Sequence, residues 1–434
     1  YRYSVDKFFI HLPMTINFKA AGFSPINNIA LKNIALKDDM HIIGIDRGER
    51  NLIYVSVIDT KGNIVEQRNF NIVNGIDYKE KLKQKELDRD NARKNWKEIG
   101  KIKDLKEGYL SLVVHEIAKL VVKYNAIITM EDLNQGFKRG RFKVERQVYQ
   151  KFETMLINKL NYLVDKDLAV DQEGGLLRGY QLTYIPESLK VLGRQCGYIF
   201  YVPAAYTSKI DPTTGFVAIF NYKGMTDKDF VTSFDSIKYD DERGLFAFEF
   251  DYENFVTHKV EMARNKWTVY TYGERIKRKF KNGLWDTAEK VDLTYQMRNI
   301  LEKYEIEYNK GQDILEQIEE LDEKAQNGIC KEIKYLVKDI VQMRNSLPDN
   351  AAEDYDVIIS PVINNNGEFF DSTRGDEDKP LDADANGAYC IALKGLYEVM
   401  QIKKNWNEET EFPRKELKIR HQDWFDFIQN KRYL

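Results

Sequence analysis

The stretch that decides the fold is HIIGIDRGERNLIYVSVIDTKGNIVEQRNFNI, residues 41–72. It contains three runs of extended character, at 41–46, 52–59 and 64–72, in which apolar and β-branched residues dominate. The connections RGERN and TKGN are short and rich in turn-forming residues, so each run can fold back on the one before it. The pattern predicts an antiparallel meander of three strands.

On the N-terminal side of this meander the pattern is weaker. Residues 6–18 resemble one or two strands of an upstream domain, and a polar segment with Gly22, Pro25 and Asn27 predicts a linker. The chain starts at Tyr1 and enters strand-like sequence at once, so we expect it to be a piece of a longer protein.

On the C-terminal side helices and strands alternate. Residues 108–124 predict a buried helix, 126–131 a short apolar strand, 144–165 a helix with apolar residues at helical spacing, and 198–202 a strand. With a last helix from Asp384, the order β-β-β-α-β-α-β predicts an α/β fold of the ribonuclease H-like type, a mixed sheet flanked by helices. Residues 206–380 differ in character and predict a domain inserted before the last helix.

A highly charged helix is predicted at residues 78–106. Alternating charge of this kind usually marks a solvent-exposed helix face. Trp96 is the exception, a large apolar residue in a polar helix. It either packs onto the domain beneath it or inserts into a partner domain.

Three acidic residues occupy the positions that a metal-dependent nuclease would use. Asp46 ends the first strand, Glu131 ends the strand at 126–131, and Asp384 opens the last helix. Magnesium and manganese prefer carboxylate oxygens. Two such ions about 3.5–4 Å apart supply a hydroxide and offset charge on the leaving oxygen during phosphodiester hydrolysis. The three residues therefore predict a site for two Mg²⁺ ions, or Mn²⁺.

Each acidic residue also has an ordinary interpretation. Asp46 can be a turn former after a strand, Glu131 can begin a loop, and Asp384 can be only a helix N-cap. Taken singly, these interpretations are as good as the functional one. Taken together on the predicted strand order, the three residues favour a nuclease.

Several segments resemble the carboxy-terminal part of the subtype V-A CRISPR RNA-guided DNA endonucleases, and the resemblance runs over essentially all 434 residues. They are IGIDRGERNLIYVSVID, MEDLNQGFKRGR, VERQVYQKFETMLINKLNYLV, AYTSKIDPTTGF, QMRNS and DADANGAYCIALKGL. The resemblance implies that Asp46, Glu131 and Asp384 are the metal ligands of a RuvC-like catalytic site. It also matches Arg344 to an arginine needed for cutting and Asp356 to an acidic residue of the same site. From the residues alone, a surface salt bridge of Arg344 with Asp339, Asp349 or Asp354 is favoured.

The resemblance divides the chain into six parts and makes Trp96 the residue of a bridge helix that docks into the recognition lobe. The parts are the tail of an OB-like wedge domain (1–24), RuvC-like part I (25–77), the bridge helix (78–98), RuvC-like part II (99–204), a Nuc domain insertion (205–380) and RuvC-like part III (381–434).

Two basic clusters are candidates for contact with nucleic acid, although charge runs are usually solvated faces. The first follows Glu131 and consists of Lys138, Arg139, Arg141, Lys143 and Arg146. The second lies in the insertion and consists of Arg275, Lys277, Arg278, Lys279 and Lys281.

Composition narrows the class of protein. Hydrophobic residues make up 43% and charged residues 31%, which suits a soluble globular protein, while a net charge of -3 makes any basic surface local. No apolar run reaches the roughly 18 residues of a membrane span. The cysteines, Cys196, Cys330 and Cys390, form no CxxC pair, which argues against a zinc ribbon and favours a reducing, cytoplasmic location.

The resemblance implies a guided endonuclease whose single site cuts both target strands and, once activated, single-stranded DNA. Its partners would be a CRISPR guide RNA, target DNA, single-stranded DNA, and the missing amino-terminal recognition and wedge domains. Two alternatives remain. One is a self-contained ribonuclease H-like nuclease, such as a junction resolvase or a transposon-borne ancestor. The other is a nucleic-acid-binding module in which the carboxylates are structural.

Overall fold

The computed structural model describes residues 21–47, 51–94, 102–132, 143–189, 193–255, 262–281, 284–309, 311–347, 355–409, 412 and 417–430. The upstream strands predicted at 6–18 lie outside these residues. No helix in these ranges is long and apolar enough to cross a membrane.

A six-stranded mixed sheet organises the N-terminal half, with strand order β3-β2-β1-β6-β8-β7. Its strands are β1 (His41–Asp46), β2 (Tyr54–Ile58), β3 (Ile64–Asn69), β6 (Ala126–Glu131), β7 (Gln195–Cys196) and β8 (Ile199–Val202). Strands β1, β2 and β3 pair antiparallel, and β6 and β8 continue the sheet parallel to β1. The predicted meander and the parallel strands after it are confirmed.

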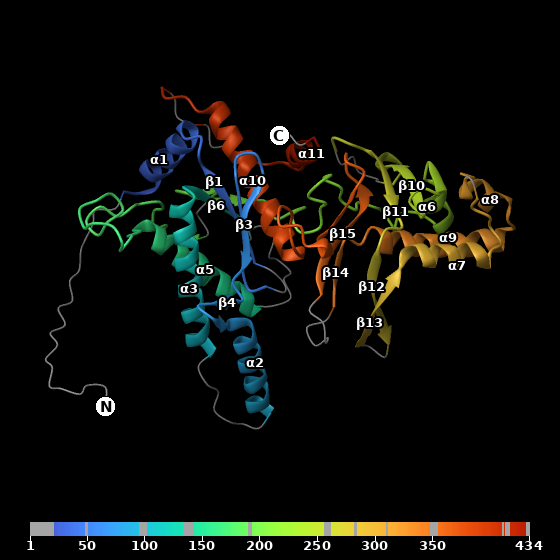
Figure 1. Cartoon of the computed structure of the whole chain (residues 1–434), viewed down its shortest axis with the longest axis horizontal. Helices are drawn as coiled ribbons and strands as arrows, with labels where there is room; N and C mark the ends of the chain where they lie inside the picture. The colour runs from blue at the N-terminus through green and yellow to red at the C-terminus, as the bar shows by residue number, and fades with distance from the viewer. Residues whose placement is uncertain are drawn as a thin grey trace.

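Helices cover both faces of this sheet. Helices α3 (Ile102–Lys123) and α5 (Lys143–Asn161) share one core with Ile43 of β1, whereas α10 (Ala383–Asn405) and α1 (Phe23–Leu36) share another core with Ile42. Successive strand residues point to opposite faces, so one strand serves both cores. Figure 1 shows this layered half on the left of the molecule.

Helix α10 lies very close to the sheet because small residues face each other. A Cβ atom on Gly44 would lie 2.1 Å from the carbonyl oxygen of Ala388, and one on Gly395 would lie 2.0 Å from Oγ1 of Thr129. No real side chain fits at such distances, so both positions require glycine. The close approach brings the first turn of α10 to the ends of β1 and β6.

The linker predicted around Gly22, Pro25 and Asn27 is wrong, because α1 begins at Phe23. Apolar residues at helical spacing are buried: Leu31 and Ile34 lie in the α10 core, and Ile26 lies in the core on the other face. Pro25 lies in the first turn, where a backbone N–H has no intrahelical partner. Asn27 is polar but buried, since its Oδ1 accepts a 2.7 Å hydrogen bond from the N–H of Gly197.

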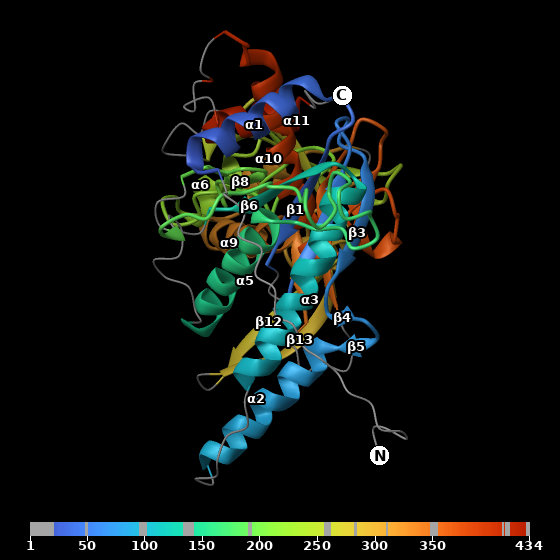
Figure 2. The ribbon, with the colours of Figure 1, turned by 90° about the vertical axis from the view of Figure 1, so that its left-hand side faces the viewer.

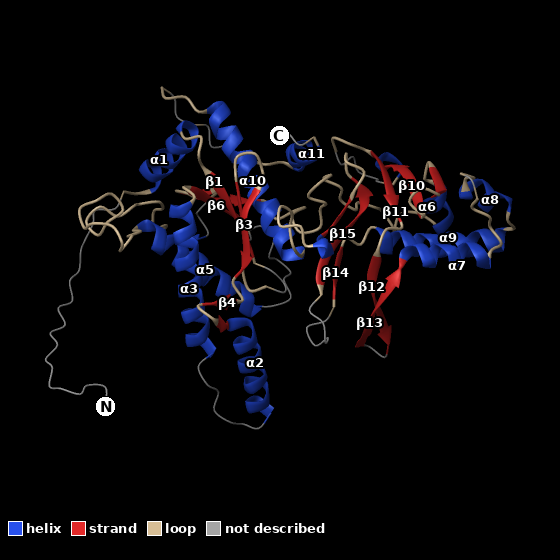
Figure 3. Cartoon of the chain, in the orientation of Figure 1, coloured by secondary structure: helices blue, strands red, loops and turns tan. Residues whose placement is uncertain are grey.

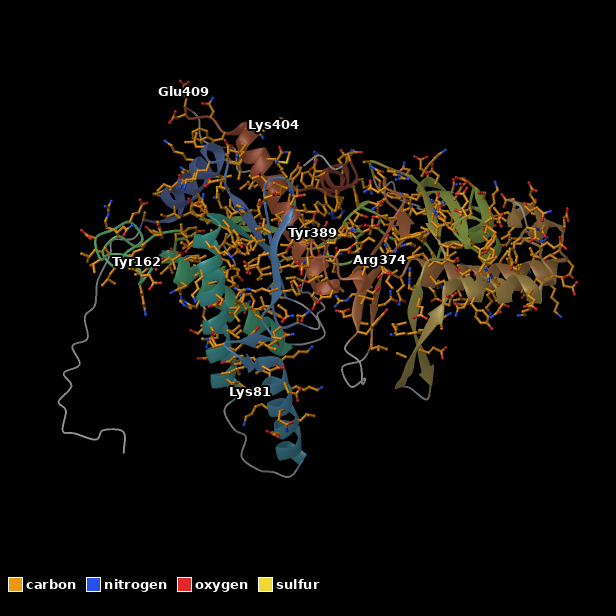
Figure 4. The ribbon with its side chains drawn as sticks, viewed as in Figure 1. Lys81, Tyr162, Arg374, Tyr389, Lys404 and Glu409 are labelled. Carbon is orange, nitrogen blue, oxygen red and sulfur yellow. The ribbon has the colours of Figure 1, made fainter. Side chains whose placement is uncertain are left out.

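The charged region forms α2 (Tyr78–Lys94), and the next helix, α3, begins at Ile102, earlier than the predicted 108. Short strands β4 (Ile72–Val73) and β5 (Ile76–Asp77) precede α2. Helix α2 and the start of α3 extend beyond the sheet (Figure 2). Lys81 of α2 and Lys404 of α10 therefore lie at opposite ends of the half that contains the sheet (Figure 4).

Residues between β8 and α10 form a second region, on the right in Figure 1. It is called the inserted region only because its residues lie in the chain between a strand of the sheet and the helix that covers the sheet. Its helices are α6 (Asp227–Thr232), α7 (Leu293–Lys303), α8 (Ile314–Glu320) and α9 (Glu323–Ile340). Its strands are β9 (Ser236–Asp240), β10 (Leu245–Asp251), β11 (Lys266–Tyr270), β12 (Glu274–Lys281), β13 (Leu284–Asp292), β14 (Arg344–Ser346), β15 (Asp356–Ile363) and β16 (Phe369–Asp371). Strands β12 and β13 form a projecting hairpin (Figure 3). The last helix of the chain, α11 (His421–Gln429), returns to the α10 core.

This inserted region has its own core, rich in phenylalanine. Arg275 of β12 is buried, and its guanidinium donates 3.0 Å hydrogen bonds to the carbonyl oxygens of Ile340 and Tyr272. Lys277 forms an ion pair with Asp339. The second basic cluster is therefore not a continuous phosphate-contacting surface, because its first residue holds the fold together.

Candidate active site

Asp46 and Glu131 are the last residues of two neighbouring parallel strands. Ile45 pairs with Met130 in the register, so the two acidic residues follow side by side at the same sheet edge. Adjacent strands lie about 4.8 Å apart. Both residues share the face that packs against α10, because Gly44 and Thr129, two positions earlier on each strand, contact that helix.

Asp384 lies in the first turn of α10 and is fully buried. The helix N-cap is Asp382, whose Oδ1 accepts a 2.6 Å hydrogen bond from the N–H of Ala385. The interpretation of Asp384 as an N-cap is therefore wrong. Its Oδ2 instead accepts hydrogen bonds from Asn51, from the backbone N–H at 2.8 Å and from Nδ2 at 3.1 Å.

A glycine brings Asp46 against the same helix turn. A Cβ on Gly387, one turn after Asp384, would lie 2.3 Å from Oδ2 of Asp46. The carboxyl group of Asp46 thus occupies the space that the side chain of any residue other than glycine at position 387 would fill. The fold brings Asp46, Glu131 and Asp384 together from three separate parts of the chain.

The electrostatics of Asp46 reflect this crowding. Burial raises the pKa of Asp46 well above its usual range, and the neighbouring carboxylates of Glu131 and Asp384 raise it further. Arg344 and Arg47 act in the opposite direction. Two like charges beside a buried carboxyl group disfavour its ionised form unless a cation is close.

Glu131 is held by groups from two other segments. Thr207, in the loop after β8, donates a 2.7 Å hydrogen bond from its hydroxyl to Oε1 of Glu131. Nη2 of Arg47 lies 3.2 Å from the carbonyl oxygen of Glu131, and its guanidinium stacks 5.1 Å from the ring centroid of Tyr149. Burial lowers the pKa of Arg47, and the charge of Glu131 partly restores it.

Arg344 reaches this site from the inserted region. Its Nε and Nη2 donate to the two oxygens of Asp356 at 3.0 and 2.8 Å, and Nη2 also lies 3.0 Å from Oδ1 of Asp384. The Arg344 side chain is 12% exposed, and that of Asp356 only 4%. The surface salt bridge considered from the sequence is therefore wrong. Bidentate pairs between arginine and a carboxylate are short and geometrically specific.

The donor atoms suit a hard divalent cation, since three carboxylates meet in one partly enclosed place. Within the described ranges, however, no group of three His, Cys, Asp or Glu side chains is arranged so that it could hold a metal ion. In this structure the carboxylate oxygens bind hydrogen-bond donors instead. Arg344 and Asn51 engage the two oxygens of Asp384, and Thr207 engages Oε1 of Glu131.

A cavity of about 410 Å³ adjoins these residues. Its lining is Ala204, Tyr206, Thr207, Ser208, Lys209, Val217, Ala218, Val341, Gln342, Met343 and Arg344. It therefore lies between the loop after β8 and the segment that leads into β14. Arg344 and Thr207 line the cavity and also bond Asp384 and Glu131, so the cavity opens beside the carboxylates.

Some candidate residues cannot be placed. Trp96, Lys138, Arg139 and Arg141 lie outside the described residues. Lys143 and Arg146 belong to the first turns of α5, but their side chains are not among those described.

The sequence also missed residues that the fold brings to the site. Asn51, Thr207 and Lys394 each bond one of the three acidic residues or the loop beside them. Asn51 lies in the turn after Asp46, and the sequence pattern there indicates only a turn former. Lys394 carried a usable signal, because it is a lysine inside the apolar stretch IALKGL of α10.

A mixed sheet of this order, with carboxylates at adjoining strand ends and at a facing helix start, defines a nuclease of the ribonuclease H-like class. The family model described as the RuvC nuclease domain matches residues 20–433, and the chain belongs to that family. The expectation of a RuvC-like nuclease with a mixed sheet flanked by helices is confirmed, and its substrate is a nucleic acid.

Proposed function

We propose that this chain is the catalytic part of a subtype V-A CRISPR RNA-guided DNA endonuclease. In this proposal Asp46, Glu131 and Asp384 hold two Mg²⁺ ions, or Mn²⁺, for hydrolysis of DNA phosphodiester bonds. The observation that carries the proposal is the meeting of these carboxylates with Arg344, which bonds Asp384 at 3.0 Å from a different region of the chain.

Each side chain has a distinct role. The three carboxylates hold the ions, which when bound provide an activated water and offset charge on the leaving oxygen. Arg344 directs N–H donors to the place where phosphate charge develops, and Asp356 holds that guanidinium in position. Thr207 and Asn51 fix the orientation of Glu131 and Asp384.

The surrounding parts take the roles implied by the family resemblance. Residues 205–380 act as a Nuc domain that assists cutting, and 25–77, 99–204 and 381–434 are the three RuvC-like parts. Residues 1–24 end a wedge domain, and the helix at 78–98 is a bridge helix that Trp96 fixes to the recognition lobe. The separate phenylalanine-rich core between β8 and α10 supports treating that region as a domain.

The substrate reaches the carboxylates as a single strand. The 410 Å³ cavity beside Arg344 supports this route, since it lies where the two regions meet. Lys138, Arg139, Arg141, Lys143 and Arg146 guide the strand by contacts with its phosphates. Guide RNA pairing selects the target, one site cuts both strands, and the activated enzyme also cuts single-stranded DNA.

The positions of the cysteines argue against the transposon-borne alternative, which carries a zinc ribbon. Cys196, Cys330 and Cys390 are all buried, and they lie in three different cores. A tetrahedral zinc site needs four ligands within about 2.3 Å of one ion.

The test is Asp46→Ala in the protein assembled with its guide RNA, with cleavage of labelled duplex and single-stranded DNA followed in Mg²⁺. We expect cleavage to be abolished while guided DNA binding stays nearly intact. Asp38→Ala is the matched control, because Asp38 is a fully exposed aspartate whose partner is the surface residue Lys403. Cutting that survives Asp46→Ala would disprove the site. Cutting that needs Asp46 but no guide RNA would disprove only the guided mechanism.

A further inference from the structure

A buried lysine lies on α10 behind the carboxylates. Lys394 is 1% exposed, and its ammonium is enclosed between α10 and the loop after β8. Buried ammonium groups require hydrogen-bond partners. Nζ of Lys394 donates to the carbonyl oxygens of Pro203 and Ala205, each at 2.6 Å, and lies 5.0 Å from the ring centroid of Trp424.

The two carbonyl groups belong to the loop that holds Glu131. This loop follows β8, whose last residue, Val202, pairs with Glu131 in the sheet. Thr207 lies at its far end, with its hydroxyl 2.7 Å from Oε1 of Glu131 and 3.0 Å from the carbonyl oxygen of Ala204. The loop thus starts beside Glu131 and returns to it.

The loop has a backbone conformation that needs support from outside. Tyr206 has a φ of 58°, in the left-handed region that side chains other than glycine rarely adopt. Its carbonyl oxygen accepts a 2.9 Å hydrogen bond from Nε1 of Trp424. Lys394 fixes the carbonyl groups on the N-terminal side of Tyr206, so the loop is fastened immediately before Thr207.

We propose that Lys394 is a positioning residue for Glu131. It clamps the loop through Pro203 and Ala205, and the clamped loop presents the Thr207 hydroxyl that sets the orientation of the Glu131 carboxylate. This inference rests on the proposed function, in which Glu131 is a metal ligand. Partners of this kind typically change metal affinity or activity by about 10- to 100-fold when removed.

The charge of Lys394 is consistent with this position. Burial lowers the pKa of Lys394 to about 8, and the nearby negative charge of Glu131 is the strongest influence that opposes the shift. The ammonium is therefore close enough to Glu131 to be felt electrostatically, although the contact between them runs through the loop.

The experiment measures Mn²⁺ binding to the 434-residue chain by electron paramagnetic resonance, which does not depend on cutting. The variants are Lys394→Met, Thr207→Val and the double variant. We expect each single change to weaken Mn²⁺ binding about tenfold. The double variant should bind no more weakly than the weaker single variant, because both changes break one pathway. Thr207→Ser, which keeps the hydroxyl, should bind like the unchanged protein.

Lys403→Met is the control on the same helix, since Lys403 pairs with exposed Asp38 at the surface. Independent, additive losses in the double variant would show that Lys394 acts only on general stability and would overturn the proposal. Unchanged Mn²⁺ binding in Thr207→Val would overturn it as well. If Lys394→Met does not fold, Lys394→Gln takes its place, and binding equal to that of the unchanged protein would again decide against the clamp.

Failure of the proposed function has a different signature. In that case Asp46→Ala would leave Mn²⁺ binding as it is. If only the clamp is wrong, Asp46→Ala still removes Mn²⁺ binding while Lys394→Met and Thr207→Val have no effect.

Discussion

The two regions of this molecule contribute different groups to one site. The mixed sheet and α10 supply the carboxyl groups of Asp46, Glu131 and Asp384. The inserted region supplies Arg344, already paired with its own Asp356. The first region packs mostly aliphatic side chains on two sheet faces, whereas the second packs a cluster of phenylalanines.

The difference shows that groups from both regions are needed to complete the site. Burial among like charges disfavours the ionised form of Asp46, and Arg344 from the inserted region and Arg47 from the sheet region offset this only in part. Hydrogen bonds to residues 210–211, in the segment after β8, connect β15 and α10. Ser360 of β15 donates to Oδ2 of Asp211 at 2.6 Å, and Asn386 of α10 donates to the carbonyl oxygen of Ile210 at 2.9 Å.

Arg344→Ala tests the contribution of the inserted region, and we expect the largest effect here. Loss of the guanidinium should reduce the cleavage rate about 100- to 1,000-fold, as for removal of a donor to developing charge. The cleavage rate of Arg344→Lys should lie between those of Arg344→Ala and the unchanged protein, because an ammonium cannot make the bidentate pair with Asp356. Single-turnover cleavage at saturating Mg²⁺ is the measurement.

Arg298→Ala serves as the control, since Arg298 lies on α7 and contacts the exposed hydroxyl of Tyr239. Asp356→Asn should have a smaller effect than Arg344→Ala, because it loosens the guanidinium without removing it. Equal cleavage by Arg344→Ala and the unchanged protein would mean that the inserted region contributes no charge to the chemistry.

Gly387→Ala tests the sheet region, with an intermediate expected effect. The new methyl group would lie 2.3 Å from Oδ2 of Asp46, so the carboxyl group or the helix must move. Displacement of a reacting group by about 1 Å can slow a reaction by about 100-fold. We expect the cleavage rate to fall by nearly that factor. The melting temperature should change only a little.

Gly108→Ala is the matched control, because a Cβ at Gly108 on α3 meets nothing within 4 Å. Alanine there should be neutral or slightly stabilising, since it favours helix over glycine. Full activity in Gly387→Ala would show that the close approach of α10 to Asp46 is not needed for cutting.

Glu398→Gln is expected to have the smallest effect, and on stability only. Glu398 of α10 is fully buried, and neither of its side-chain oxygens has a hydrogen-bond partner among the described residues. Burial raises the pKa of Glu398 well above its ordinary value of 4.5. The folded chain therefore keeps this proton at a pH where the unfolded chain has released it.

This difference in proton binding makes the free energy of unfolding depend on pH. The stabilising contribution is complete below pH 4.5 and is lost as pH rises toward the folded pKa. Glu398→Gln should lack this loss. Its free energy of unfolding, relative to that of the unchanged protein, should therefore rise by about 1.4 kcal/mol per pH unit between pH 4.5 and the folded pKa. Urea unfolding of both proteins at several pH values measures it. Parallel stability curves would mean that Glu398 is ionised in the folded protein.

The strands and the placement of two acidic residues were predictable, because period-two patterns and turn residues act locally. Asp46 and Glu131 end such strands, and the strand order alone places them at one edge. Helix α1 was missed because Gly22 and Pro25 are strong turn signals that outweighed the apolar spacing of Ile26 and Ile34.

The contacts around the carboxylates were not predictable from local pattern. Asn51 meets Asp384 and Lys394 meets Pro203 only after α10 has docked, and the partners are far apart in the chain. Arg344 and Asp356 were suggested by family resemblance alone, because a single arginine among acidic residues is usually a surface ion pair. Geometry shows that this arginine is largely buried instead.

The close packing of α10 on the sheet also has a consequence for synthesis. Helix α10 comes after the whole inserted region, yet it covers β1, which leaves the ribosome long before α10 is made. Contacts between residues so distant in the chain form late in folding. A nascent chain that has not yet reached α10 lacks Asp384 and therefore cannot contain the complete carboxylate site. The cell thus makes the cutting centre only when nearly the whole of this chain has been translated.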